Sequence, residues 1–102
     1  MGFGNLAKMA QQMQADMARA EQELTQLRVE GTAGGGAVKA VVTGKRDLLS
    51  IEIQRDVVDP EDVDMLQDLV LAAVTDALQQ AKKAEEERMA RITGGMRIPG
   101  MG

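Results

Sequence analysis

Residues 29–54 read VEGTAGGGAVKAVVTGKRDLLSIEIQ, and short apolar runs in this stretch alternate with turn-forming residues. Successive side chains of a strand point to opposite faces of its sheet, so the alternation predicts three strands joined as an antiparallel meander with one face in water. The expected turns are Gly34–Gly36, where glycine adopts positive φ at little cost, and 44–47. The predicted strands span 29–33, 37–43 and 48–54. The apolar face of the last strand consists of Leu49, Ile51 and Ile53.

Helices are predicted on both sides of these strands. Upstream, apolar residues recur at intervals of three and four, a heptad pattern that predicts a helix over 6–28. Its stripe consists of Leu6, Ala10, Met13, Met17, Ala20, Leu24 and Leu27. Downstream, Asp59 is the expected N-cap and Pro60 the first residue of a helix over 60–92. With a flexible tail at 93–102, the elements predict one α+β domain over 1–102, in the order α-β-β-β-α.

The composition excludes several kinds of chemistry. The 102 residues include no Cys, His, Trp or Tyr, which excludes disulfides, thiol nucleophiles, imidazole bases and the usual zinc sites. The longest apolar run, Leu69 to Val74, is too short to span a membrane, and residues 1–20 contain no apolar segment typical of a signal peptide. We therefore expect a cytoplasmic protein.

The net charge of −4 is unevenly distributed along the chain. Residues 1–46 carry six basic and four acidic side chains, and residues 77–102 carry five basic and three acidic ones. Residues 47–76 carry nine acids and a single base, Arg55. Both ends are thus basic and only the middle repels an anion, because the local field matters as well as the total charge.

The predicted helices are longer than a sheet of this size can cover. Each Å² of apolar surface left in water costs about 25 cal/mol of free energy. A short chain has too small a core to bury all of this surface, and a second subunit can cover the rest. A homodimer is therefore favoured, and the alternative is a monomer whose two helices pack against each other. The predicted interface consists of Met13, Met17, Leu69, Val70, Ala73, Val74 and Ala77.

Short segments spread over nearly the whole chain form a recognisable combination. They are NLAKMAQQMQ (5–14), VEG (29–31), GGGAVK (34–39), MLQDLV (65–70) with Ala72 and Ala73, and MARITGGM (89–96) with Pro99 and Gly100. In this order they resemble the YbaB/EbfC family of bacterial nucleoid-associated proteins. The resemblance implies an α-β-β-β-α subunit and a homodimer whose long helices project as tweezer-like arms. It also implies a location in the cytoplasm and nucleoid, and binding to double-stranded DNA with little sequence preference.

Basic residues near the helix ends are the candidate DNA contacts. If the two helices run antiparallel beside the sheet, these charges gather at one tip and bind the DNA backbone in a strongly salt-dependent manner. Lys82 and Lys83 have an alternative role as helix support, through i,i+4 pairs with Glu86 and Glu87. The candidate DNA-binding residues are Lys8, Arg19, Lys82, Lys83, Arg88, Arg91 and Arg97.

Other functions are less well supported by the residues. The glycine-rich stretch 31–39 lacks the Lys-Ser/Thr pair of a phosphate loop, and the acids of 56–64 lack the glycine and glutamate of a helix-loop-helix calcium site. Ser50 is the only serine and has no base in prospect, so we expect no enzyme, metal, cofactor or small-molecule substrate. The runner-up is a protein-interaction module that recruits a DNA-repair or replication partner, which the net negative charge favours.

Overall fold

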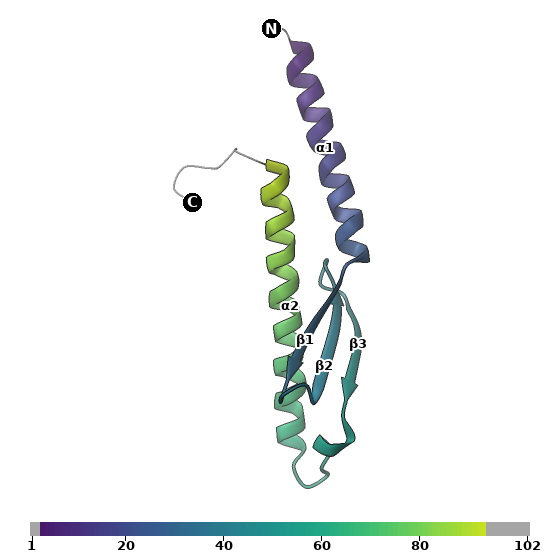
Figure 1. Cartoon of the computed structure of the whole chain (residues 1–102), viewed down its shortest axis with the longest axis vertical. Helices are drawn as coiled ribbons and strands as arrows, with labels where there is room; N and C mark the ends of the chain where they lie inside the picture. Colours follow the sequence, from purple (N-terminus) through teal and green to yellow (C-terminus); the bar gives the residue numbers. More distant parts are fainter. Residues whose placement is uncertain (1–2, 94–102) are drawn as a thin grey trace, which may run out of the picture.

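In the computed structural model, which describes residues 3–93, a long helix covers one face of a three-stranded sheet and a second long helix extends from one end of that sheet (Figure 1). The elements are α1 (Phe3–Gln26), β1 (Arg28–Ala33), β2 (Val38–Thr43), β3 (Leu48–Ile53), a single 3-10 turn η1 (Arg55–Val57) and α2 (Val63–Thr93). This order confirms the predicted α-β-β-β-α fold. The predicted tail lies, from residue 94 onward, outside the described residues, and so does Arg97.

The sheet has the strand order β1-β2-β3 with both pairs antiparallel, which confirms the meander. Gly34, Gly35 and Gly36 form the first turn with φ angles of 64°, 67° and 93°, a run of positive φ that other residues adopt only with strain. The pairing of β2 with β3 shifts register between Val41 and Val42. An irregularity of this kind bends the strand locally.

The core lies between the sheet and α2. Val38, Ala40 and Val42 of β2 are fully buried and cluster with the small side chains of α2. The fully buried residues of α2 are Ala73, Ala77 and Ala81. Because α2 presents alanine to the sheet, its backbone approaches β1 closely, and a Cβ at Gly31 would lie only 2.2 Å from the Ala77 amide nitrogen. Glycine at position 31 therefore permits this packing distance.

The start of α2 differs from the prediction. Asp62 caps the helix, because its Oδ1 accepts a hydrogen bond from the Met65 amide at 3.2 Å. Asp59 instead closes the preceding turn, where its Oδ1 accepts from the Glu61 amide at 2.9 Å. The prediction that Asp59 is the N-cap and Pro60 the first helical residue was therefore wrong, and α2 begins three residues later.

Helix α1 is packed only along its C-terminal part. Ala20 and Leu24 are buried, whereas Leu6 is 64% exposed and Met17 is 45% exposed. The Gly44 amide donates to the Leu24 carbonyl at 2.8 Å, which ties the end of α1 to the β2–β3 turn. The N-terminal half of α1 extends beyond the end of α2 (Figure 1). The heptad stripe predicted the helix correctly, but much of it remains exposed in the single subunit.

The sheet face opposite α2 is polar. Lys39 lies between two carboxylates, with its Nζ 3.3 Å from Glu52 and 3.7 Å from Glu30. The hydrogen bond to Glu52, followed by the charges of Glu30 and Glu52, raises the pKa of Lys39 above its ordinary value of 10.5.

The whole subunit measures 71 × 29 × 16 Å and has a radius of gyration of 19.4 Å. A compact chain of this length has a radius of about 13 Å.

Candidate nucleic-acid interface

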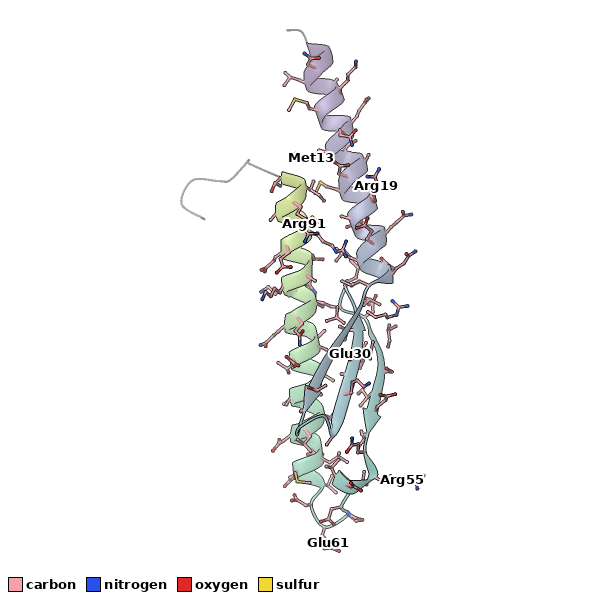
Figure 2. All side chains as sticks on the ribbon, viewed as in Figure 1. Met13, Arg19, Glu30, Arg55, Glu61 and Arg91 are labelled. Atoms are coloured by element: carbon pink, nitrogen blue, oxygen red, sulfur yellow. The ribbon has the colours of Figure 1, made fainter. Side chains whose placement is uncertain are left out.

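The two helices run antiparallel, so the N-terminal half of α1 and the C-terminal end of α2 lie at the same end of the molecule (Figure 1). Figure 2 shows Arg19 of α1 and Arg91 of α2 together at this end. Lys8 is exposed about 16 Å further along α1, from a rise of about 1.5 Å per residue. Arg88 lies on α2 one helical turn before Arg91. We refer to Lys8, Arg19, Arg88 and Arg91 as the basic tip.

A cleft of about 190 Å³ separates the helices at the basic tip. Arg88 donates to Glu23 across the cleft through Nη1 and Oε2, and Arg19 Nη1 lies 3.9 Å from Asp16 on the same helix. Arg91 is exposed and has no carboxylate partner among residues 3–93. The lining of this tip cleft comprises Asp16, Arg19, Ala20, Glu23, Arg88, Arg91 and Ile92.

Lys82 and Lys83 lie on α2 between the sheet and the tip, and both are exposed. Within the described helix neither lysine forms an ion pair, so the alternative in which they pair with Glu86 and Glu87 is not what the structure shows. Their ammonium groups are therefore open to an external anion. Successive residues of an α-helix are rotated by about 100°, so Lys82 and Lys83 lie on a different face of α2 from Arg88 and Arg91, and they extend the exposed positive charge to that face.

Three basic residues of β2 and the β2–β3 turn form ion pairs within the subunit, whereas Arg28 of β1 is exposed and donates only to backbone carbonyls at the end of α1. Lys45 Nζ lies 3.4 Å from Glu21 of α1 and 3.9 Å from Glu85 of α2. Arg46 reaches the same Glu85 at 3.2 Å, and Lys39 is held by its two glutamates. The pairs of Lys45 and Arg46 help to join the β2–β3 turn to both helices, and the three ion-paired cations are less available to an external anion.

Acidic residues occupy the opposite end of the molecule, around η1 and the start of α2. Figure 2 shows Glu61 there, beside the isolated Arg55. This acidic end consists of Asp56, Asp59, Glu61, Asp62, Asp64 and Asp68. The long axis of the subunit therefore runs from a basic tip to an acidic base, as the uneven charge of the sequence predicts.

The residues predicted for the dimer interface do not form one surface. Ala73 and Ala77 are fully buried inside the subunit, and they are therefore not accessible to a partner. Three others are half-buried beside the core: Leu69, Val70 and Val74. The remaining two lie on α1 beyond the sheet: Met13 and Met17. Within the subunit α1 and α2 contact each other where α1 passes the end of α2.

A different apolar surface is open. Strand β3 carries large side chains on the core side of the sheet, because Ile51 pairs with Ala40 and Ile53 with Val38. Helix α2 packs over β1 and β2, and these β3 side chains remain between 39% and 50% exposed. We name them the β3 apolar face: Leu48, Leu49, Ile51 and Ile53. The sequence showed their alternation but not that the helix leaves them uncovered.

The described residues offer little for other kinds of site. Residues 3–93 contain no group of three or more His, Cys, Asp or Glu side chains placed to hold a metal ion. Neither α1 nor α2, as described, combines the length and the hydropathy needed to cross a bilayer.

An elongated α-β-β-β-α subunit with cations along its helical end has the features of a small protein that binds a large anion. A profile of the YbaB/EbfC DNA-binding family matches residues 1–96, and this chain belongs to that family. It is 57% identical to a nucleoid-associated protein of Exiguobacterium, with 97% of each chain covered. It is 55% identical to one from Thermoanaerobacter pseudethanolicus, over 97% of this chain and 89% of the relative.

The fold is also found among solved structures. An uncharacterized protein from Helicobacter pylori superimposes with a TM-score of 0.78 over 92% of this chain and 99% of that chain, at 19% sequence identity. At this identity the likeness concerns the fold alone. Membership of the family therefore rests on the sequence matches, and the solved structure shows that the same fold occurs in another bacterial protein.

Proposed function

We propose that this protein acts in the nucleoid as a homodimer that binds double-stranded DNA with little sequence preference, through the basic tip together with Lys82 and Lys83. The observation that carries the proposal is the segregation of charge. Lys39, Lys45 and Arg46 are paired within the subunit, whereas Lys8, Arg91 and the two lysines are exposed on the helices, away from the acidic end around η1. Such a molecule orients its helical end toward a polyanion and its base away from it.

The residue types favour contact with the backbone of DNA over contact with its bases. Lys and Arg bind phosphate oxygens irrespective of sequence, and they release counterions when they do so. Phe3 is the single aromatic residue of the chain, so the side chains that stack on bases are almost absent from the sequence. Binding should therefore be weakly selective among duplexes and strongly weakened by salt.

The β3 apolar face supplies the surface for a second copy of the chain. This face is uncharged and lies at an open strand edge, whereas the outer edge of β1 is partly closed by Asp76, whose Oδ2 accepts from the Thr32 amide at 3.1 Å. Two copies that cover each other's β3 apolar face, about an axis along the molecule, would point both basic tips the same way. A duplex about 20 Å wide would then lie between two arms, as the tweezer arrangement requires.

Fluorescence anisotropy with two unrelated duplexes, from roughly 50 to 300 mM salt, tests this function. We expect similar affinities for both duplexes and a steep loss with salt. Arg91→Glu should weaken binding at least about tenfold, since one phosphate contact becomes a repulsion. Arg55→Glu is the matched control, because it makes the same change of charge at the acidic end and should alter binding less than about twofold.

Two results would contradict the proposal. Affinity that does not respond to salt would exclude an electrostatic mechanism, and equal losses from both variants would exclude the tip as the site. Duplex binding weaker than roughly 10⁻⁴ M at physiological salt would favour the runner-up, a module that recruits a DNA-repair or replication protein. In that case the β3 apolar face would be the surface on which the protein partner docks.

A further inference from the structure

The tip cleft brings three arginines and two carboxylates together between α1 and α2. We propose that this cleft is a phosphate-binding site for the DNA backbone, in which Arg19, Arg88 and Arg91 hold the phosphate and Glu23 is an internal competitor for it. The proposal rests on the function proposed above. It adds a defined site for a DNA phosphate and a residue, Glu23, that lowers the affinity of this site for DNA.

The arginines come from both helices, so the site exists only where α1 and α2 run side by side. Arg88 is the most enclosed of them, with 28% of its side chain exposed, whereas Arg19 is 68% exposed. A guanidinium offers a planar fork of donors that matches the oxygens of a phosphate. The remaining lining, Ala20 and Ile92, is apolar and offers no side-chain group that competes for those donors. The cleft volume of about 190 Å³ leaves room for a phosphate group.

Glu23 now accepts a hydrogen bond from one donor of Arg88, its Nη1. Half of the Glu23 side chain is exposed, and an ion pair open to solvent contributes little net free energy. A phosphodiester carries the same single negative charge as the carboxylate, and because Glu23 stays attached beside the cleft when a phosphate enters, the two anions compete for Arg88 and repel each other. Glu23 therefore adds a weak link between α1 and α2 in the absence of DNA, and it lowers the affinity of the cleft for phosphate. Asp16 is a weaker competitor, since it lies 3.9 Å from Arg19.

Glu23→Gln tests the competitor, because glutamine has the same shape without the charge. We expect it to bind a short duplex about three- to tenfold more tightly than the wild type at moderate salt, with a steeper dependence on salt. Glu87→Gln is the matched control, because it removes one charge next to Arg88 in the sequence but outside the cleft lining. The increase in the logarithm of the binding constant caused by Glu87→Gln should be less than about half of the increase caused by Glu23→Gln.

A second variant separates competition from a general change of charge. In the Glu23→Gln background, Arg91→Gln should remove most of the gain, since the two side chains line one cleft and their effects should not add. Circular dichroism and melting of each variant show whether α1 is still docked. Weaker binding by a folded Glu23→Gln protein, or equal gains from Glu23→Gln and Glu87→Gln, would overturn the competitor. If the wild type itself does not bind DNA, the proposed function is wrong as well. If the wild type binds DNA but Glu23→Gln does not bind more tightly than Glu87→Gln, only the role of Glu23 is wrong.

Discussion

At the residue scale, Gly31 sets the distance between the sheet and α2. A Cβ at this position would lie 2.2 Å from the Ala77 nitrogen and 2.4 Å from the Ala73 oxygen. Both neighbours are backbone atoms of a helix, so the contact cannot be relieved by a side-chain rotation. We therefore expect Gly31→Ala to lower the free energy of unfolding by about 3 kcal/mol, at the upper end of the usual cost of overpacking.

Urea unfolding at a fixed protein concentration measures this loss. Gly4→Ala is the control, because a Cβ at Gly4 meets nothing within 4 Å and the residue lies in α1. It should be neutral or stabilise the protein by up to about 1 kcal/mol. Equal free energies of unfolding for Gly31→Ala and the wild type would mean that α2 can move away from β1 without cost.

Single residues also show the limits of the sequence. Gly34–Gly36 could be predicted as a turn, because three consecutive glycines favour a turn through their own backbone freedom, whatever their distant contacts are. Asp59 and Asp62 have the same capping chemistry, and only the path of the chain decides which one precedes the helix. Ala77 was predicted at a partner interface because its stripe continues along α2, but it is buried by the sheet of its own subunit. Periodicity identifies the apolar side of a helix but not what covers it.

At the scale of elements, β3 is the strand that α2 leaves uncovered. The alternating residues of β3 predicted the strand and its apolar side correctly. They could not predict that this side is exposed, because one helix is too narrow to cover all three strands and lies over β1 and β2. If the β3 apolar face binds a second copy, Ile51→Glu should dissociate the dimer at micromolar concentration, because a carboxylate would be buried without a partner. Ile51 is 39% exposed in the subunit, so the monomer should stay folded.

Sedimentation velocity, with circular dichroism as the check on folding, measures this effect. Ser50→Glu is the matched control, since Ser50 pairs with Val41 on the polar side of the same strand. It adds the same charge one residue away and should leave the dimer intact. A monomeric wild type, or a dimer that Ile51→Glu leaves unchanged, would show that β3 is not the interface.

At the scale of the whole molecule, the positions of the charges follow from the antiparallel course of the helices. The sequence showed two basic ends and an acidic middle, and a topology in which both helix ends meet was enough to predict a shared tip. It did not show that Arg88 is engaged by Glu23, because residues 65 positions apart meet only through the tertiary fold. Nor did it show that Lys39, Lys45 and Arg46 form ion pairs within the subunit, which sharpens the contrast between the two ends of the molecule.

Dimerisation and DNA binding should therefore be coupled through the number of tips that one duplex contacts. The logarithm of the binding constant falls with the logarithm of salt concentration by about 0.9 for each phosphate contact. A dimer that grips one duplex between two tips makes twice as many contacts as a subunit with one tip. The Ile51→Glu monomer should thus show about half of the wild-type slope, and Ser50→Glu, with the same added charge, should keep the full slope. An unchanged slope in a variant shown to be monomeric would mean that a single tip makes all the contacts and that the two arms do not act together on one duplex.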